Sequence, residues 1–288
     1  MLAYRVALRE FDAARHPENA AVNYMLTNTK MLFASILKDL SADCVCDIGS
    51  RDGAQSLLFR ELLPNAIVVA FEANPINFQM MQANPALRSN RIEMHPFAVT
   101  NSNSVSKFHI TDVDYSNPAE NRGTSSLLVH AELKILRSVD VHTCRIDDFI
   151  LKHHPQATSI GLWIDVEGVE YFVLEGISKI KDRVMAVHVE TAKTPMRQGQ
   201  KTFAELLPLM ESYGFGLCGS NIGERDNWGD VVFLNGSTRQ ALRVRMGVCK
   251  AKAYCSKLVK IDSIAVCLKS RVPFLYHLLR RLYIKLWA

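Results

Sequence analysis

The chain has 288 residues, of which 48% are apolar and 22% charged, and its formal net charge is +5. This composition is ordinary for a globular protein with one large domain and an extension, whose core needs no disulfide support. The seven cysteines form no Cys-x-x-Cys pair, and no run of 18 apolar residues occurs, so we expect no zinc site, disulfide framework or transmembrane span. Because Arg5 and Arg9 interrupt the N-terminus, we expect no signal peptide and a reducing, cytoplasmic location.

Charge is spread unevenly along the chain. From Arg239 to the end there are twelve basic residues and one acidic residue, Asp262, which leaves a net charge of −6 on the remainder. The pattern predicts three parts: an N-terminal helical extension over 1–40, a central α/β domain over 41–236, and a basic, partly amphipathic tail over 237–288.

Helix and strand patterns alternate in the first third of the chain. Apolar residues recur at helical spacing from about Val22 to Leu40, and Cys44–Cys46 reads as a short buried strand. A helix through Leu57–Leu62 must end before Pro64, and Ala66–Phe71 is an apolar run of strand length. This alternation is typical of βαβ units.

The middle of the chain holds further strands. Asn74-Pro75 is typical of a helix start, with asparagine as N-cap and proline at the first helical position. We expect a third strand over Ile92–Val99 and two additional strands, Val105–Ile110 and Val139–Ile146. The polar segment Tyr115–Ser126 between these two strands predicts an irregular loop.

The last part of the central domain repeats the alternation. We expect strand, helix, strand and helix over Ile160–Asp165, Glu170–Ile180, Val184–Glu190 and Thr202–Tyr213. Phe215–Cys218 and Asp230–Leu234 follow without a helix between them, which suits an antiparallel hairpin at a sheet edge. The sequence therefore predicts a Rossmann-like α/β fold, with a doubly wound, mostly parallel sheet and a C-terminal antiparallel hairpin.

Two polar segments follow the first two strands, where open α/β sheets bind ligands. In Asp47-x-Gly49-x-x-x-Gly53, glycines let the backbone approach a ligand, and the next helix offers N–H groups to an anionic group. The alternative is a simple turn with a capping aspartate. Glu72 ends the second strand, where a carboxylate accepts from ribose hydroxyls. The predicted cofactor-binding residues are Asp47, Gly49, Gly53, Glu72, Asn74, Ala98 and Asp165.

The candidate catalytic residues end the fourth and fifth strands. Asp165 is the first candidate for a general base, Glu190 the second, and His188 shares the strand face of Glu190. A buried core histidine is the alternative for His188, and favourable helix-terminus charge is the alternative for Glu167 and Glu170. We expect no metal, although Asp165, Glu167 and Glu190 are the residues that would hold a hard cation such as Mg²⁺.

Several segments together resemble the FkbM family of S-adenosylmethionine (SAM)-dependent methyltransferases over about Val45 to Leu234. They are CDIGSRDGAQSLLF, VVAFEANPINF, NRGTSSL, CRIDDFI and, most specifically, LWIDVEGVEYFVLEGI. The resemblance implies that Asp47, Gly49 and Glu72 bind SAM. It places Asp165 and Glu167 at the reacting face and implies O-methylation of hydroxyls on sugars, polyketides or related metabolites.

The chain departs from the family pattern at two places. Ser50-Arg51 stands where a small residue followed by Asn is usual, and Ala73 stands where Pro is common. Arg51 is a large cation beside a cofactor that is itself cationic at sulfur, so we expect its side chain to point to solvent or to an acidic substrate.

The basic tail lies outside the resemblance. Phe274–Trp287 has leucines on one side and basic residues on another, a pattern typical of a helix in a membrane interface. The alternatives are packing on the central domain or on a second copy in a homo-oligomer, and contact with nucleic acid, which ranks last because no nucleic-acid module accompanies the tail.

The sequence hypothesis is a SAM-dependent methyltransferase that O-methylates a hydroxyl of a carbohydrate or other metabolite, so its partner is a small-molecule or glycan acceptor. A rival is a non-catalytic SAM-fold binding protein that docks to a membrane or partner through the tail. A nicotinamide-dependent oxidoreductase is a further rival, disfavoured because the loop lacks G-x-G-x-x-G.

Overall fold

The computed structural model describes residues 28–111, 123–223 and 226–238. The predicted tail helix, the start of the predicted helix at Val22 and most of the loop Tyr115–Ser126 lie outside these residues. Among the described residues, no helix is long and apolar enough to cross a membrane.

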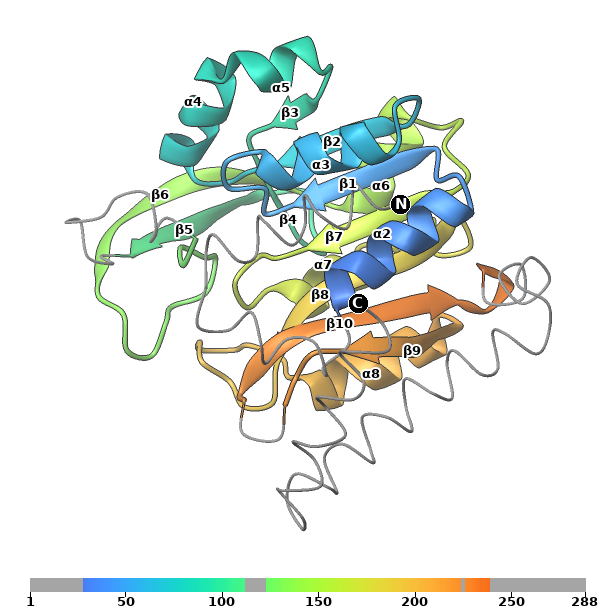
Figure 1. The fold of residues 1–288 in the computed structure, drawn as a ribbon. Coiled ribbons are helices and arrows are strands. Elements are labelled where there is room, and N and C mark those ends of the chain that lie inside the picture. Colours follow the sequence, from blue (N-terminus) through green and yellow to red (C-terminus); the bar gives the residue numbers. More distant parts are fainter. Residues whose placement is uncertain (1–27, 112–122, 224–225, 239–288) are drawn as a thin grey trace, which may run out of the picture.

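A seven-stranded sheet forms the centre of the described structure (Figure 1). Its order is β3 (Glu93–His95), β2 (Ile67–Phe71), β1 (Cys44–Ile48), β7 (Ile160–Ile164), β8 (Val184–Ala192), β10 (Trp228–Asn235) and β9 (Phe215–Ser220). The first five strands are parallel, and β10 runs antiparallel to both β8 and β9. The predicted doubly wound sheet with an antiparallel hairpin at its edge is confirmed.

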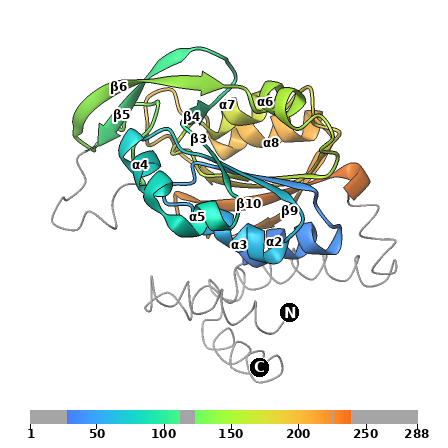
Figure 2. The ribbon, with the colours of Figure 1, turned by 90° about the horizontal axis from the view of Figure 1, so that it is seen from above.

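Helices cover both faces of this sheet (Figure 2). On one side lie α2 (Thr29–Asp39), α3 (Ala54–Leu62) and α5 (Pro85–Ser89), with α4 (Pro75–Ala83) beside them. On the other lie α6 (Ile146–His153), α7 (Glu170–Glu175) and α8 (Phe203–Ser212). Each face has its own buried apolar cluster, so the strand sequences are apolar on both faces, as a covered parallel sheet requires.

Helix α2 completes the core on the first of these faces. Asn28 caps it by accepting from Met31 N at 3.0 Å, and the face that contains Phe33 and Leu37 is buried. The packing is close, because a Cβ on Gly161 of β7 would lie 2.4 Å from Leu37 Cδ2. The described part of the expected extension, residues 28–40, therefore packs on the central sheet.

The expected third strand over Ile92–Val99 is two strands in two sheets, so that prediction is wrong. Pro96 has no N–H to give to a ladder, and the chain changes sheets there. β4 (Phe97–Val99) joins β6 (Ile135–Cys144) and β5 (Val105–Thr111) in a second sheet of order β4-β6-β5. This small sheet lies on the side to which the parallel strands point (Figure 1).

Two further boundaries differ from the prediction. Ile146, expected in a strand, begins α6, because Asp147 in the first turn favours a helix start there. α7 ends at Glu175 rather than continuing to Ile180. Gly176 follows it, and a Cβ on Gly176 would lie 2.8 Å from Thr100 O, so the close approach of these two chain segments ends the helix.

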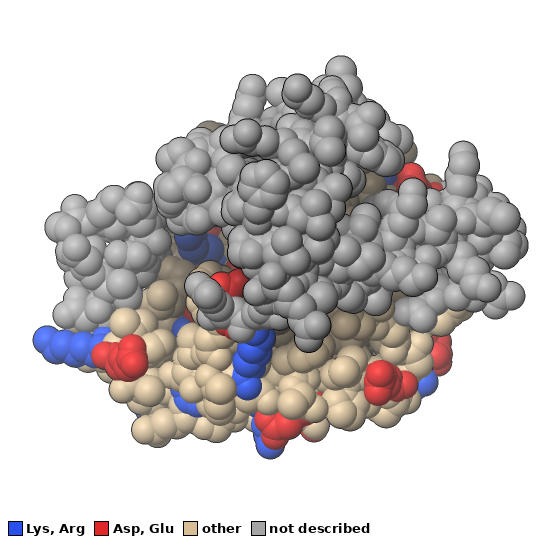
Figure 3. Space-filling model, turned by 60° about the horizontal axis from the view of Figure 1, so that its bottom comes forward, with Lys and Arg blue, Asp and Glu red and all other residues tan. Residues whose placement is uncertain are grey.

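The described surface shows no extended patch of one charge in the view of Figure 3. Lys and Arg side chains are interspersed there with Asp and Glu side chains among neutral residues. The view therefore favours no polyanion-binding face within the described residues that it shows.

Candidate active site

The turn after β1 packs directly on the end of β7. Gly49 N and Ser50 N donate to Phe71 O at 3.0 and 2.9 Å, and Asp165 N donates to Ile48 O at 2.9 Å. Gly49 has φ +86°, and a Cβ on it would lie only 1.7 Å from Asp165 O. Glycine at this position is thus required by the chain's own packing, in addition to any ligand approach.

The N-terminus of α3 is partly satisfied by the chain itself. Gly53, at φ +79°, precedes the helix, and a Cβ on it would meet Leu87 at 2.6 Å. Ala54 N donates to Asp52 Oδ1 at 3.0 Å. Fewer N–H groups than expected are therefore left at this terminus for an anionic ligand group.

Asp47 is a buried acid beneath the turn. Its Oδ2 accepts from Ser50 Oγ at 2.7 Å and from Ser56 Oγ at 2.5 Å. Its Oδ1 is buried and has no hydrogen-bond partner in the described part of the chain. Burial raises the pKa of Asp47 to about 6, against the opposing effect of these hydrogen bonds. One carboxylate oxygen is therefore available to a cationic ligand group or a bridging water.

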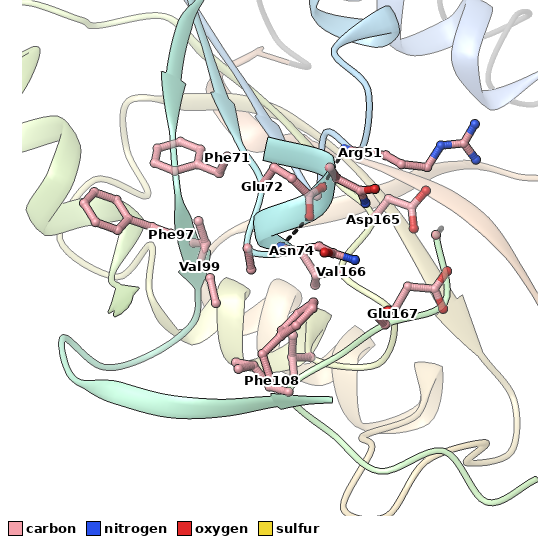
Figure 4. A pocket seen from close by; sticks show the side chains of 18 residues that line it. Arg51, Phe71, Glu72, Asn74, Phe97, Val99, Phe108, Asp165, Val166 and Glu167 are labelled. Atoms are coloured by element: carbon pink, nitrogen blue, oxygen red, sulfur yellow. Dashed lines mark hydrogen bonds between the residues drawn. The ribbon is translucent and has the colours of Figure 1, made fainter. Parts of the chain in front are cut away.

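A cleft of about 730 Å³, its open mouth included, runs across the carboxyl ends of β2, β1 and β7 (Figure 4). Among the predicted cofactor-binding residues, those that line it are Gly49, Glu72, Asn74, Ala98 and Asp165. Asp47 and Gly53 lie outside its lining. The structure thus brings the ends of three neighbouring strands to one cleft.

Glu72 lies in a rigid cradle at one end of the cleft (Figure 4). Its Oε2 accepts from Arg51 N and its Oε1 from Asn74 N, each at 2.7 Å. Asn74 also caps α4 by accepting from Ile76 N at 3.1 Å. Burial raises the pKa of Glu72 to about 7, although these backbone donors oppose the rise. The carboxylate lines the cleft, where it can accept a hydrogen bond from a ligand hydroxyl.

The wall next to this cradle is apolar. Ala98 and its neighbours Phe97 and Val99 come from β4, and Phe108 comes from β5 of the small sheet. The chain leaves the large sheet at Pro96, and β4 therefore lines the cleft. The change of sheet at this residue, which the sequence analysis did not predict, places these side chains in the wall. An apolar wall beside a polar cradle suits a ligand with a flat ring and a hydroxylated part.

The other end of the cleft is acidic. One carboxylate oxygen each of Asp165, Glu167 and Glu190 lies within 4.8 Å of the others. Desolvation, followed by the charges of Glu167 and Asp230, raises the pKa of Asp165 to about 7, although the Asp165 residue itself is exposed. Desolvation, with the surrounding carboxylates, raises the pKa of Glu190 well above its usual range. The crowding of carboxylates therefore favours the protonated form of both groups relative to an isolated carboxyl.

Glu167 is held by an ion pair that sequence reasoning missed. Its φ is +59°, an uncommon conformation for a residue with a Cβ, and its carboxylate pairs with the guanidinium of Arg197. Arg197 is 4% exposed and lies in the loop after β8, and its Cδ would be 2.8 Å from a Cβ on Gly168. Burial raises the pKa of Glu167 to about 7, and Arg197 opposes that rise. A lone arginine in a loop offers no sequence signal for this role.

Two more charges face the acidic end, Lys30 from α2 and Asp230 from β10. Lys30 Nζ lies 5.8 Å from the centre of the Trp163 ring, and its charge lowers the pKa of Asp165. Asp230 is paired in register with Glu190 across the β8–β10 ladder. The predicted hairpin placed Asp230 in a strand at the sheet edge. No pattern in the sequence placed Lys30 beside a strand end.

The His188 side chain is buried in the core and does not line the cleft. Its ring stacks on Trp163 at 3.6 Å between centroids, and its Nε2 lies 3.3 Å from Thr29 Oγ1. The side chain is 1% exposed, and burial lowers its pKa to about 4. Asp230 Oδ1 is 4.0 Å from Nε2. These surroundings are those of a neutral core histidine.

The acidic end is balanced in part by the chain's own cations. Arg197 pairs with Glu167, and the charge of Lys30 acts on Asp165. A bound Mg²⁺ would compete with both for the same carboxylates. That no metal is bound by Asp165, Glu167 and Glu190 stays a prediction.

The family model described as "Methyltransferase FkbM domain" matches residues 47–217, more than half of the chain. The match begins at Asp47 and spans the cleft from the β1 turn to β9. It therefore includes the motif segments on which the predicted resemblance was based.

Individual relatives are distant. The chain is 22% identical over 175 residues to 2-O-methyltransferase NoeI of Sinorhizobium fredii. The aligned residues cover 59% of this chain and 71% of that protein. Methyltransferase FkbM from Methylobacillus flagellatus is 17% identical with a TM-score of 0.41. The match covers 67% of this chain but less than half, 43%, of that one. Magnesium protoporphyrin IX methyltransferase from Synechocystis, solved with SAM, is 11% identical with a TM-score of 0.40, over 75% of this chain and 81% of that one.

Proposed function

Because the chain belongs to the FkbM family of SAM-dependent methyltransferases, we propose that it transfers the methyl group to a hydroxyl of a carbohydrate or other metabolite. The observation that supports this most directly is the division of the cleft. One end is a cradle built around Glu72, and Asp165 and Glu167 line the other, where an oxygen of Glu190 lies within 4.8 Å of theirs. The family membership also sets aside the nicotinamide-dependent alternative.

The residues of the cleft fit SAM. Glu72 has lone pairs for the ribose hydroxyls, beside the apolar wall that contains Ala98 and Phe108. Asp47 has a buried oxygen without a partner in the described chain, which suits the ammonium side of the methionine moiety. The acidic end suits a sulfonium, because carboxylates stabilise a neighbouring positive charge. When bound, SAM supplies an electrophilic methyl group.

In this proposal Asp165 is the general base. It lines the cleft, and its pKa of about 7 leaves an ionised fraction at neutral pH to take the proton of the acceptor hydroxyl. Glu190, whose pKa is raised by desolvation and by the neighbouring carboxylates, is the second candidate for contact with the acceptor. In this proposal the buried, neutral His188 has no catalytic role.

A carbohydrate acceptor is supported by the name of one relative, the 2-O-methyltransferase NoeI, and by the chemistry of the site. Carboxyl groups at the end of a cleft accept hydrogen bonds from several hydroxyls of one ligand. Positioning a hydroxyl beside a reactive methyl group can supply roughly 7–11 kcal/mol of a barrier. The acidic end is the part of the cleft with that capacity.

The test is transfer of labelled methyl from SAM. Purified full-length protein would be incubated with labelled SAM and fractionated glycans and metabolites, and acceptors would be identified by a gain of 14 mass units. Label stable to mild alkali indicates an ether rather than an ester. Asp165→Asn is the matched control, because it keeps the size of the side chain and removes the base.

Each outcome has a distinct meaning. Binding of SAM with label on a hydroxyl supports the proposal. Binding of SAM with no transfer to any fraction supports the rival of a SAM-fold binding protein, and absence of SAM binding contradicts both. Asp165→Asn that transfers at the unaltered rate contradicts the assignment of the base.

A further inference from the structure

Trp228 is a large aromatic side chain that the structure leaves in solvent. It is 56% exposed, the largest exposed fraction among the described aromatic residues. It opens β10, and its register partner is Ala192 at the end of β8. Because β10 runs antiparallel to β8, this strand start lies at the same edge of the sheet as the ends of β7 and β8 (Figure 1).

Strand alternation places Trp228 on the face of the sheet that carries the acidic end. Trp228 and Asp230 are two residues apart, so their side chains share one face. Asp230 is the register partner of Glu190, which places Glu190 on that face as well. Trp228 therefore lies roughly 7 Å along the strand beyond Asp230, at the rim.

Hydrogen bonds hold the chain next to Trp228. Asn227 O accepts from Lys193 N at 2.6 Å, and Asn227 Oδ1 accepts from Thr194 N at 3.0 Å and from Thr194 Oγ1 at 2.6 Å. Asp230 is fixed too, since Asn221 Nδ2 donates to its Oδ2 at 2.8 Å. An exposed tryptophan on a backbone fixed in this way is preorganised for a partner.

We propose that Trp228 is the platform of the acceptor subsite, and that a neutral polyhydroxylated ring packs its apolar face on the indole. This inference rests on the proposed function and names its substrate class. The indole supplies a flat apolar surface, and Asp230 and Glu190 accept hydrogen bonds from hydroxyls on the same sheet face. The negative charge of Asp230, which is paired in register with Glu190, disfavours phosphorylated or carboxylated acceptors.

The acceptor then extends from the rim toward the base. Cofactor residues lie on the Glu72 side of Asp165, and Trp228 lies on the opposite side, beyond β8 and Asp230. An acceptor that rests on Trp228 and extends over Glu190 presents a hydroxyl to Asp165 from the side opposite the cradle. Trp228 would thus select and position the acceptor without touching the methyl donor.

The experiment uses full-length protein loaded with S-adenosylhomocysteine and a set of neutral methyl hexosides, read by saturation-transfer NMR. Hexose 6-phosphates form the anionic arm. The variants are Trp228→Ala, Trp228→Phe and, as a matched control, Leu151→Ala, a 37% exposed leucine of α6 on the other face of the sheet. We expect Trp228→Ala to weaken hexoside binding about tenfold, with Trp228→Phe and Leu151→Ala within about threefold of the unaltered chain.

Methyl transfer distinguishes this inference from the proposed function. With a glycan that the unaltered chain methylates, Trp228→Ala should raise KM about tenfold and leave kcat and SAM affinity nearly unchanged. Equal KM in Trp228→Ala, equal loss in Trp228→Phe, or stronger binding of hexose phosphates would overturn the inference while the proposed function stands. Failure of the unaltered chain to methylate any glycan would contradict the carbohydrate proposal and this inference together.

Discussion

The two ends of the cleft differ in how their carboxylates are satisfied. At the cradle, both oxygens of Glu72 accept from backbone N–H groups of the neighbouring loops. At the acidic end, Asp165, Glu167 and Glu190 lie within 4.8 Å of one another, and Arg197 and Lys30 balance their charge only in part. The cradle is therefore a preformed recognition site, whereas the acidic end stores repulsion that a cationic ligand or a proton relieves.

The strongest test of this comparison exchanges one carboxylate at each end. Asp165→Asn should lower kcat by about 10²–10⁴, because the acceptor loses its base, and change the SAM dissociation constant only slightly. Glu72→Gln should weaken SAM about tenfold or more, because a charged hydrogen-bond acceptor is lost, with kcat at saturating SAM nearly unchanged. Calorimetry and steady-state kinetics measure the two quantities. Similar effects of both variants on kcat would remove the functional distinction between the ends.

A second test addresses the contact that joins the ends. Gly49→Ala should lower the free energy of unfolding by about 3 kcal/mol or more, because the new Cβ overlaps Asp165 O and the backbone is at φ +86°. Gly214→Ala is the control, since Gly214 has φ +85° with nothing within 4 Å of a Cβ, which isolates the backbone strain. Urea denaturation compares the variants. Equal losses would show that the strand-end contact is not the cause.

A third test uses pH and stability. The pKa of Glu72 is about 7 in the folded chain and near 4.5 when unfolded, so the folded state binds the proton more tightly. Its contribution to stability is complete below pH 4.5 and is lost as pH rises through 7, about 1–3 kcal/mol in all. Denaturation at a series of pH values should therefore show a smaller decline for Glu72→Gln than for the unaltered chain. A steeper decline in the variant would contradict the raised pKa.

A fourth test changes the charges that act on Asp165. Glu167→Gln removes a negative charge and should lower the pKa of Asp165. Lys30→Met removes a positive charge and should raise it. Because the base must be ionised, the acidic limb of the kcat–pH profile should move to lower pH in the first variant and to higher pH in the second. Shifts in the same direction would indicate that a different group controls the limb.

The smallest expected effect is at the cradle. Arg51 has φ +57°, and asparagine tolerates that conformation better than arginine. Arg51→Asn should raise the free energy of unfolding by about 0.5–1 kcal/mol, because the Arg51 N–H to Glu72 bond uses only the backbone. Thermal denaturation measures it, with Arg88→Asn on α5 as a control without a positive φ. A loss of stability in Arg51→Asn would assign a stabilising role to the guanidinium.

Much of the fold follows from local patterns. Asn74-Pro75 starts α4 as predicted, and the apolar runs Cys44–Cys46 and Ala66–Phe71 fall in adjacent parallel strands. Glu72 and Asp165 reach one cleft because carboxyl ends of parallel strands meet at one edge. The strand boundary at Pro96 was misjudged because an apolar run does not reveal a change of sheet.

The site was only partly predictable. Asp47, Glu72 and Asp165 stand directly after apolar runs in the sequence, a short-range signal. Arg197 and Lys30 are distant in sequence and carry no motif, yet they pair with or act on the acidic end. Close approach to a ligand is only part of the reason for glycine at position 49, because the missing Cβ also makes room for Asp165 O.

The sequence by itself determined the doubly wound order of strands and helices and which acids end which strands, since periodicity and turn residues are local properties. Only the tertiary structure decided how those acids are tuned. Desolvation and the distances among Asp165, Glu167, Glu190, Lys30 and Arg197 depend on loops and a helix that the chain brings together from positions far apart. Electrostatic energy depends on separation in space and on burial, and neither is written in the order of residues.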